Sequence, residues 1–423
     1  MARMQKKTTM LIKNIGQLVT MQGSVPRRGR FMNEIGLITN GAVAVAGDEI
    51  LAVGKSDDIV GRVELAENCD VISAENHVVT PGFIDPHTHP VFVGTREAEF
   101  EMRLAGKSYM EIAQAGGGIR STVRQVREAT GEELYATSRK TVAALLAHGV
   151  TSIEAKSGYG LSTEAELKSL EVIRRLNELE PVDLYPTFLG AHEVPDEYRD
   201  HHKEYVELVI NEMIPAVAAK KLALFCDVFC EDGVFTVEES RAILTAARKA
   251  GMQLKLHADE LKSTGGAELA AEMGAISADH LMFISDKGIE MLAASQTAAV
   301  LLPGTSFALG LDKTAPARTM IEKGVIVALA TDCNPGSSMT ESLAMIITLA
   351  ALKLKMTAAE ALSAVTVNAA CAIGQGERLG RLESGLPADI AIWDMRDYRE
   401  LPYHYGVNLV ETVIKNGKVV VTR

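Results

Sequence analysis

Long apolar runs are missing from this sequence, and their absence bears on where the protein resides. The longest run, residues 343–352, ends at Lys353 and is far shorter than the roughly 20 residues that a membrane-spanning helix needs. The basic first residues lead into no continuous hydrophobic stretch and no small-residue cleavage site, so a secretory signal is not predicted. We therefore expect a cytoplasmic protein without a membrane span.

Cysteines are few and are not arranged as a disulfide framework. The five are Cys69, Cys226, Cys230, Cys333 and Cys371. An odd number of scattered cysteines favours free thiols in a reducing compartment.

Positive charge is scarce as well. The chain has 43 Lys and Arg against 55 Asp and Glu, a net charge of −12, and no basic stripe with interleaved aromatics. Such a chain repels phosphate backbones, so we expect no nucleic-acid partner. Any anionic ligand must be recruited by cations close to its site.

What the sequence does contain suits one large globular domain and an accessory one, since 47% of its 423 residues are apolar. Residues 1–79 show short β patterns, with a hairpin turn predicted at Gly47-Asp48. The carboxyl terminus returns to β patterns, with a strong hairpin signal at Asn416-Gly417. We expect residues 1–79 and 377–423 to form one composite β-sandwich domain, which residues 80–376 interrupt.

In the interrupting segment, apolar strands alternate with amphipathic helices. The predicted strands are residues 79–85, 151–155, 184–189, 222–229, 253–257, 276–280, 298–302 and 325–330. One helix is predicted to begin with a capping box formed by Thr163 and Glu166. Eight alternations indicate a (β/α)8 TIM-like barrel with its functional residues at the carboxyl ends of the strands. The competing doubly wound sheet lacks its glycine-rich phosphate turn here.

Histidines and a carboxylate follow several of these strands at their carboxyl ends. They are His87 and His89 after the first strand, His192 after the third, His257 at the fifth, His280 at the sixth and Asp332 after the eighth. Each alone could cap a strand or bond a buried carbonyl, but a barrel brings all of these ends to one cavity. Three imidazoles and one carboxylate leave an open position on zinc or iron for water, whose pKa falls to about 7 there. The pattern therefore predicts metal-dependent hydrolysis.

Several segments together match a known pattern. They are Pro81-Gly82-Phe83-Ile84-Asp85-x-His87-x-His89, His257, His280, Thr331-Asp332 and Gly380-x-Leu382-x-x-Gly385-x-x-Ala388-Asp389. In them the chain resembles the metal-dependent amidohydrolase superfamily over nearly its full length, which implies hydrolysis of an amide or amidine.

A second set of segments narrows this resemblance. It comprises Gly94-Thr95-Arg96, Gly116-Gly117-Gly118-Ile119, Lys156-Ser157-Gly158-Tyr159-Gly160, Gly190-Ala191-His192-Glu193-Val194-Pro195, His257-Ala258-Asp259-Glu260 and Thr331-Asp332-x-Asn334-Pro335-Gly336-Ser337. These resemble the branch of the superfamily that opens the ring of 4-imidazolone-5-propanoate with water, giving N-formimidoyl-L-glutamate in histidine degradation. The resemblance implies a small-molecule substrate (imidazolone propionate), one Zn²⁺ or Fe³⁺ per subunit and a homodimer.

The resemblance also assigns catalytic roles. The metal ligands would be His87, His89, His257 and Asp332, so that a metal-activated water attacks the cyclic amide carbonyl. His280 would hydrogen-bond the water or the developing oxyanion, and Asp332 would accept a proton. Glu260 can contact a ring nitrogen of the substrate and shuttle a proton, unless it is an exposed carboxylate at a helix start. Lys156 ends the second strand and not the fourth, so it is a poor candidate for the bridging carboxylated lysine of two-metal relatives.

Besides Glu260, substrate contacts are expected from three places. Arg96 can bind a propionate tail bidentately, unless it is a surface arginine paired with Glu97 or Glu99. Tyr159 and His192 would offer neutral hydrogen-bond donors to the carboxylate and the ring. The third place is the turn after the eighth strand, where Asn334, Gly336 and Ser337 would meet the formimidoylglutamate end.

Two rival readings stay open. The same barrel and metal could serve a deaminase acting on an aryl or imino amine, which releases ammonia. The barrel could also be a catalytically idle binding module, because fold alone does not determine function. Metal content and product identity separate these readings.

Overall fold

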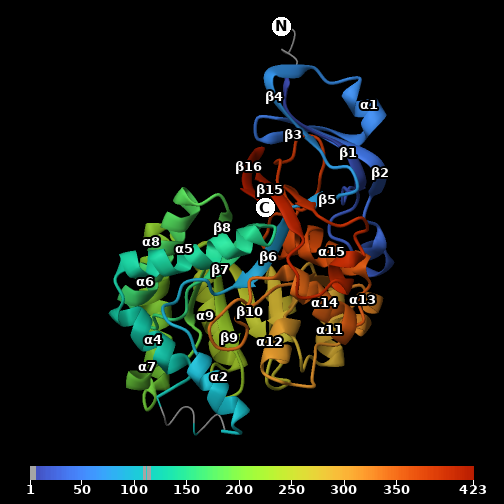
Figure 1. The fold of residues 1–423 in the computed structure, drawn as a ribbon. Coiled ribbons are helices and arrows are strands. Elements are labelled where there is room, and N and C mark those ends of the chain that lie inside the picture. The colour runs from blue at the N-terminus through green and yellow to red at the C-terminus, as the bar shows by residue number, and fades with distance from the viewer. Residues whose placement is uncertain (1–5, 108–110, 112–115) are drawn as a thin grey trace.

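The computed structural model describes residues 6–107, 111 and 116–423. Eight parallel strands form its centre, and each pairs with the next along the chain (Figure 1). They are β6 (Phe83–Thr88), β7 (Val150–Lys156), β8 (Asp183–Ala191), β9 (Phe225–Cys230), β10 (Gln253–Ala258), β11 (Ser277–His280), β12 (Ala298–Leu301) and β13 (Ile326–Leu329). This confirms the predicted barrel. Among the described residues, no helix combines the length and apolarity that crossing a bilayer requires.

The first and last barrel strands meet through residues that lie just beyond β13. The Asp332 backbone N–H donates to the His87 carbonyl at 3.1 Å, and the His89 N–H donates to the Cys333 carbonyl at 3.0 Å. The buried Asp85 carboxylate accepts the Thr331 hydroxyl at 2.6 Å. These contacts between β6 and the residues after β13 place Asp332 beside His87 and His89, at the carboxyl end of β6.

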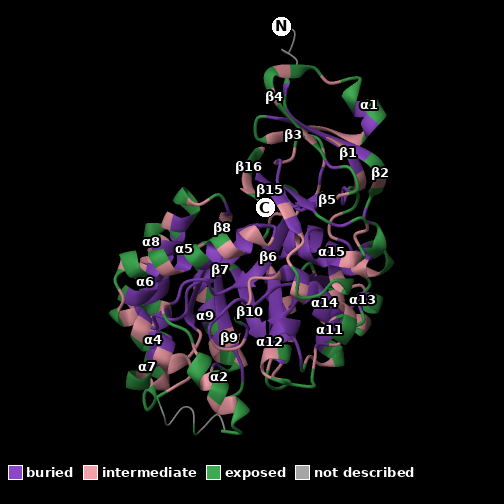
Figure 2. Cartoon of the chain, viewed as in Figure 1, coloured by how far each residue is buried: buried purple, intermediate pink, exposed green. Residues whose placement is uncertain are grey.

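Helices cover the outside of the barrel, and the barrel strands are buried within it (Figure 2). The short helix Ser56–Val60 is an exception, because it packs on the amino-terminal strands and lies away from the barrel. The helices are α1 (Ser56–Val60), α2 (Glu97–Leu104), α4 (Ile119–Glu128), α5 (Gly131–Ala147), α6 (Thr163–Leu179), α7 (His202–Leu208), α8 (Ile214–Lys220), α9 (Val237–Lys249), α10 (Gly266–Glu272), α11 (Asp286–Ala294), α12 (Pro303–Ala308), α13 (Ala317–Lys323), α14 (Leu343–Lys353), α15 (Ala358–Val365), α16 (Val367–Ala372) and α17 (Glu400–Tyr403). Short 3₁₀ turns lie at η1 (Gly29–Asn33) and η2 (Asp196–Tyr198), and a π-helical turn lies at η3 (Val209–Met213).

The predicted capping box of α6 is wrong. Ser162 is the N-cap, and its hydroxyl accepts the Ala165 N–H. Glu166 turns inward instead and accepts the backbone N–H groups of Gly158, Gly160 and Leu161 at 2.8 to 3.0 Å. These N–H groups are buried, and leaving them without acceptors would cost more free energy than the loss of a capping bond at the start of α6.

Both chain ends build a second sheet, as expected. Its eight strands are β1 (Thr8–Val19), β2 (Leu37–Ala46), β3 (Glu49–Lys55), β4 (Leu65–Ser73), β5 (Val78–Pro81), β14 (Ile390–Trp393), β15 (Val410–Lys415) and β16 (Lys418–Thr422). The blue and red strands of Figure 1 lie side by side in it. Both predicted hairpins are confirmed, since Ala46 pairs with Glu49 and Lys415 with Lys418.

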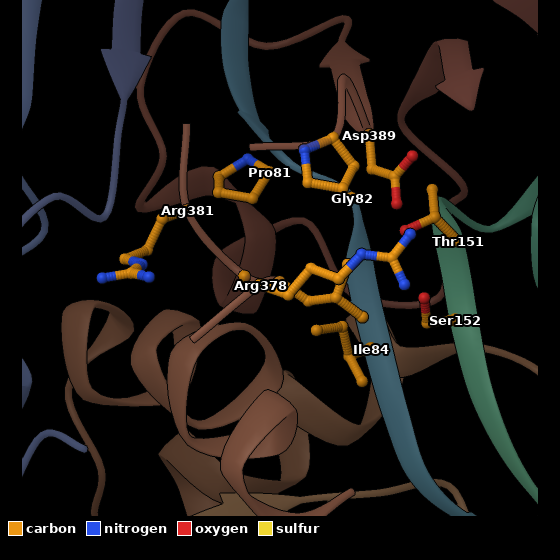
Figure 3. Close-up of a pocket in the computed structure, with 11 residues that line it drawn as sticks. Pro81, Gly82, Ile84, Thr151, Ser152, Arg378, Arg381 and Asp389 are labelled. Carbon is orange, nitrogen blue, oxygen red and sulfur yellow. The ribbon is translucent and has the colours of Figure 1, made fainter. Parts of the chain in front are cut away.

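The chain passes from this sheet into the barrel at Gly82, shown in Figure 3. Here the predicted strand 79–85 divides into β5 and β6, which belong to different sheets. A Cβ on Gly82 would collide with the Thr151 side chain, so the crossing requires glycine. The cavity beside it measures about 10 Å³ and holds at most a water molecule.

Candidate active site

A cavity of about 530 Å³ opens at the carboxyl ends of the barrel strands, within the range of small-molecule sites. The predicted site residues that line it are His89, Arg96, Tyr159, His192, His257, Glu260, His280, Asp332, Asn334, Gly336 and Ser337. His87 is fully buried beneath them. The structure therefore brings together residues from segments that are far apart in sequence.

Three predicted metal ligands converge tightly. His87 Nε2 lies 3.3 Å from His89 Nε2, and Asp332 Oδ1 lies 3.4 Å from the first and 3.6 Å from the second. Zinc–nitrogen bonds of about 2.0 to 2.1 Å in a tetrahedron place neighbouring donor atoms roughly 3.3 Å apart. The three atoms thus have the spacing of ligands around one ion.

His257 completes the cluster from β10. Its ring centroid lies 4.6 Å from that of His87 and 5.5 Å from that of His89. Its buried Nε2 has no hydrogen-bond partner within the described chain, and a buried polar atom of this kind calls for a ligand. The donor atoms of His280 and His192 also lie within 4.8 Å of His257, so five imidazoles surround this point.

Most of these imidazoles are neutral. Burial lowers the pKa of His87, His89 and His280 well below the ordinary value, and that of His192 to about 3. Their lone pairs are therefore available near neutral pH. Burial opposes protonation of His257 too, but the Asp227 carboxylate outweighs burial and raises the pKa of His257.

Asp332 is oriented by a residue that the sequence analysis missed. The Thr305 hydroxyl, in α12, donates to Asp332 Oδ2 at 2.6 Å, which leaves Oδ1 to face His87 and His89. Burial raises the pKa of Asp332 to about 6. Thr305 follows the seventh strand closely, and this position is the only sequence signal it carries.

Glu260 lines the cavity and is not an exposed carboxylate at a helix start. Its Oε2 lies 3.5 Å from His280 Nε2. Burial, and next the negative charge of Asp332, raise the pKa of Glu260 to about 8. In the metal-free chain this raised pKa favours a protonated carboxyl group near neutral pH, which can donate a proton.

Arg96 is positioned by a hydroxyl and not by an acid. Its Nε and Nη2 donate to Thr122 Oγ1 at 2.9 and 2.7 Å, and no carboxylate within the described residues forms an ion pair with it. Glu99, one of its two expected partners, accepts the Gly118 N–H instead. The Arg96 charge therefore remains available to an anion.

His192 differs from its expected role. Its Nδ1 lies 2.9 Å from the Gly158 carbonyl oxygen, which can only accept, so Nδ1 carries the proton and Nε2 is left as an acceptor. The prediction of a donor is therefore wrong for His192. Tyr159 keeps the donor role open, because its hydroxyl has no hydrogen-bond partner within the described residues.

The turn after β13 is held mainly by its own bonds. Asn334 Oδ1 accepts the N–H groups of Gly336 and Ser337 at 2.8 Å, and Asn334 Nδ2 donates to the Asp332 carbonyl and to Ser337 Oγ. The Asn334 side chain thus shapes the cavity wall. Gly336 leaves room for Arg96, since a Cβ there would lie 2.5 Å from Arg96 Nη1.

Other residues at the site were also missed. Phe229 lines the cavity at the end of β9 and stands edge-on to His257, with centroids 5.7 Å apart. Asp279 and Asp227 lie behind the histidines, with oxygens 2.6 Å from His87 Nδ1 and 2.9 Å from His257 Nδ1. Phe229, at the end of a predicted strand, and Asp279, directly before His280, had a positional signal in the sequence, and Asp227 had none.

Comparison with known sequences gives full-length matches. The profile described as "Amidohydrolase family" matches residues 78–420. An imidazolonepropionase of Alkaliphilus oremlandii is 52% identical over 413 residues, covering 97% of this chain and 98% of its own length. An imidazolonepropionase of Geobacillus kaustophilus is 52% identical over 416 residues, with coverage of 97% and 98%.

Solved structures share the fold at low identity. An adenosine deaminase from Xanthomonas campestris with bound zinc superposes with a TM-score of 0.70 at 18% identity, covering 99% of this chain and 94% of its own. A 5-methylcytosine deaminase from Klebsiella pneumoniae gives 0.72 at 18% identity, with 98% of both chains covered.

Proposed function

This chain belongs to the amidohydrolase family and, within it, to the imidazolonepropionases, and from that premise we propose how its cavity performs the reaction. The enzyme is a metal-dependent hydrolase of histidine degradation. It adds water to the ring carbonyl of 4-imidazolone-5-propanoate, breaks the adjacent ring C–N bond and yields N-formimidoyl-L-glutamate.

One observation carries the proposal. A cluster of imidazoles and one carboxylate shares a cavity with an arginine that no acid of the described residues neutralises. The cluster can hold a metal ion that activates water for hydrolysis, and the guanidinium can bind a substrate that has a carboxylate tail. A small ring that bears a propionate needs both.

The ion is proposed to be one Zn²⁺ or Fe³⁺ per subunit, held by His87, His89, His257 and Asp332, because nitrogen and oxygen donors suit either metal. When bound, it supplies Lewis-acid activation of water and of the ring carbonyl. Lys156 Nζ already lies 2.7 Å from both Glu154 and Asp227, which supports a mononuclear site without a carboxylated lysine.

The side chains then act in sequence. Arg96 binds the propionate, and His192 Nε2 accepts a ring N–H. Asp332 takes a proton from the attacking water, while His280 hydrogen-bonds the water or the oxygen that gains negative charge. Glu260, protonated, donates a proton to the departing ring nitrogen.

The test follows loss of imidazolonepropionate by absorbance and identifies the product by mass, on metal-replete and chelator-treated protein. We expect formimidoylglutamate to form and activity to disappear on chelation. Release of ammonia from the substrate would favour a deaminase. Protein that binds no metal and turns over no substrate would favour an idle barrel.

Three further properties are part of the proposal. We infer a cytoplasmic location, a homodimer as the resemblance implies, and a division into a terminal β domain and a barrel domain. The second boundary stays at residue 377, and the first moves from residue 79 to Gly82, because β5 belongs to the terminal sheet. Light scattering tests the dimer, and limited proteolysis tests whether cleavage falls near residue 377, which is exposed, whereas the boundary at Gly82 is buried.

A further inference from the structure

A layer of charged side chains lies directly behind the histidine cluster. Lys156, Asp227 and Asp279 come from β7, β9 and β11, the second, fourth and sixth barrel strands, and all three are fully buried. Alternate strands fill a barrel in such layers, usually with bulky apolar side chains. Charged side chains are therefore unusual in this layer, and we expect them to have a specific role.

Each carboxylate of the layer orients one proposed metal ligand. Asp279 Oδ2 lies 2.6 Å from His87 Nδ1, and Asp227 Oδ2 lies 2.9 Å from His257 Nδ1. Asp227 also accepts the His257 backbone N–H through Oδ1 at 3.1 Å. At His87 the hydrogen bond to Asp279 fixes the tautomer and the ring direction, so that Nε2 presents its lone pair to the cavity. At His257 the Asp227 carboxylate holds the backbone N–H and lies in ion-pair contact with Nδ1.

Lys156 is the cation shared by both carboxylates. Its Nζ lies 2.7 Å from Asp227 Oδ2 and 3.6 Å from Asp279 Oδ2, which are the oxygens that face the two histidines. A third buried acid, Glu154, lies 2.7 Å away. Without this ammonium the carboxylates would be buried with too little opposing charge, which favours rearrangement of the cluster.

We propose that Lys156 is a positioning residue for the metal site, which anchors Asp227 and Asp279 together and thereby directs His257 and His87 at the ion. The inference rests on the proposed metal site and extends it to a residue that touches neither ion nor substrate. Because Lys156 acts through the histidines, its removal weakens metal binding itself and not only turnover.

The experiment measures zinc affinity on metal-free protein by competition with a chromophoric chelator. Lys156→Met should bind Zn²⁺ roughly 10- to 100-fold more weakly than the unaltered chain, the usual effect of losing an outer-shell partner. Near-UV circular dichroism checks that the variant is folded. Should Lys156→Met not fold, Lys156→Gln, which keeps one amide donor, takes its place in the same comparison.

Lys415→Met is the matched control. Lys415 is also buried between two carboxylates, 2.6 Å from Asp389 and 2.8 Å from Asp183, but it lies in the terminal sheet. We expect it to lose stability and to keep its zinc affinity within about twofold. Equal weakening in both variants would show general destabilisation and overturn the proposal.

A double-mutant cycle tests the route of the effect. If Lys156 acts through Asp227, Lys156→Met should weaken zinc binding less in an Asp227→Asn background than alone. Full additivity, or unchanged zinc affinity in Lys156→Met, would overturn the anchoring role alone. An unaltered chain that binds no zinc would overturn the proposed metal site as well.

Discussion

At the scale of single residues, the role of a side chain in this cavity depends on which of its atoms are already hydrogen-bonded. Thr305 occupies one oxygen of Asp332, and Gly158 occupies one nitrogen of His192. Asp332 Oδ1 and His192 Nε2 are therefore the atoms that remain available to contact an ion or a substrate.

Asp332→Asn should abolish turnover and leave the fold intact. An amide cannot take the proton of water and is a weaker metal ligand, so kcat should fall by roughly 10²- to 10⁴-fold. Steady-state kinetics measures the loss, and circular dichroism checks the fold. A folded variant with the original rate would refute the role of Asp332.

Arg96→Ala should lower kcat/KM about 10²-fold, because it removes a bidentate charge-assisted contact to the propionate. This fall corresponds to a loss of transition-state stabilisation on the order of 3 kcal/mol. Arg139→Ala is the control, since Arg139 is exposed and pairs with Glu180 outside the cavity. An unaltered kcat/KM in Arg96→Ala would remove Arg96 from the substrate site.

Glu260→Gln should change how stability depends on pH in the metal-free protein. The pKa of Glu260 is raised to about 8 from 4.5, so its stabilising contribution is complete below about pH 4.5 and is lost as the pH rises to about 8. In this window the free energy of unfolding should fall in the unaltered protein relative to Glu260→Gln, by roughly 1.4 kcal/mol per pH unit. Denaturant unfolding at several pH values measures it, and parallel pH profiles for the two proteins would contradict it.

At the scale of elements, loops after the strands place the binding groups, and buried side chains hold those loops. Glu166 in α6 accepts three backbone N–H groups of the loop that carries Tyr159. Asn334 does the same within the turn after β13. Substrate affinity therefore depends on how these loops are shaped as well as on the groups they carry.

Gly336→Ala should raise KM by roughly tenfold with a smaller effect on kcat, because the new Cβ would push Arg96 Nη1 from its position. Gly131→Ala is the matched control, since a Cβ at Gly131 meets nothing within 4 Å. Steady-state kinetics on both variants gives the comparison. Equal KM values would show that Arg96 moves without consequence or does not bind substrate.

At the scale of the whole molecule, the metal site joins segments from across the barrel. His87 and His257 lie in the first and fifth barrel strands, and Asp332 lies just after the eighth, so an ion bound to them links segments from across the barrel. Binding to the folded state alone stabilises a protein by mass action. Metal binding should therefore be visible in global stability.

Zinc added to chelator-treated protein should raise Tm in a concentration-dependent way, corresponding to about 2.7 kcal/mol at 100 times Kd. Asp332→Asn should show a smaller rise, because one ligand is weakened. Thermal unfolding followed by circular dichroism at increasing zinc measures both. A Tm that does not respond to zinc would contradict the proposed site.

Much of the architecture could be predicted from local patterns. All eight barrel strands and both hairpins occur within a few residues of their predicted places, because alternating apolarity and turn residues such as Asn416-Gly417 act locally. The local pattern failed at Thr163–Glu166, where a buried loop competed for the carboxylate. The local pattern also predicted one strand over residues 79–85, where the structure has the two strands β5 and β6. No local feature of the sequence shows that the chain passes from one sheet to the other at Gly82.

The sequence alone determined the barrel, the residues at its strand ends and the family, because these follow from periodicity and from motifs that are contiguous in the chain. Only the tertiary structure decided which atoms are free to act. The partners that decide it, Thr305 for Asp332, Thr122 for Arg96 and Lys156 behind the histidines, come from other strands and helices. Contacts between distant segments form only when the barrel closes, so no pattern along the chain records them.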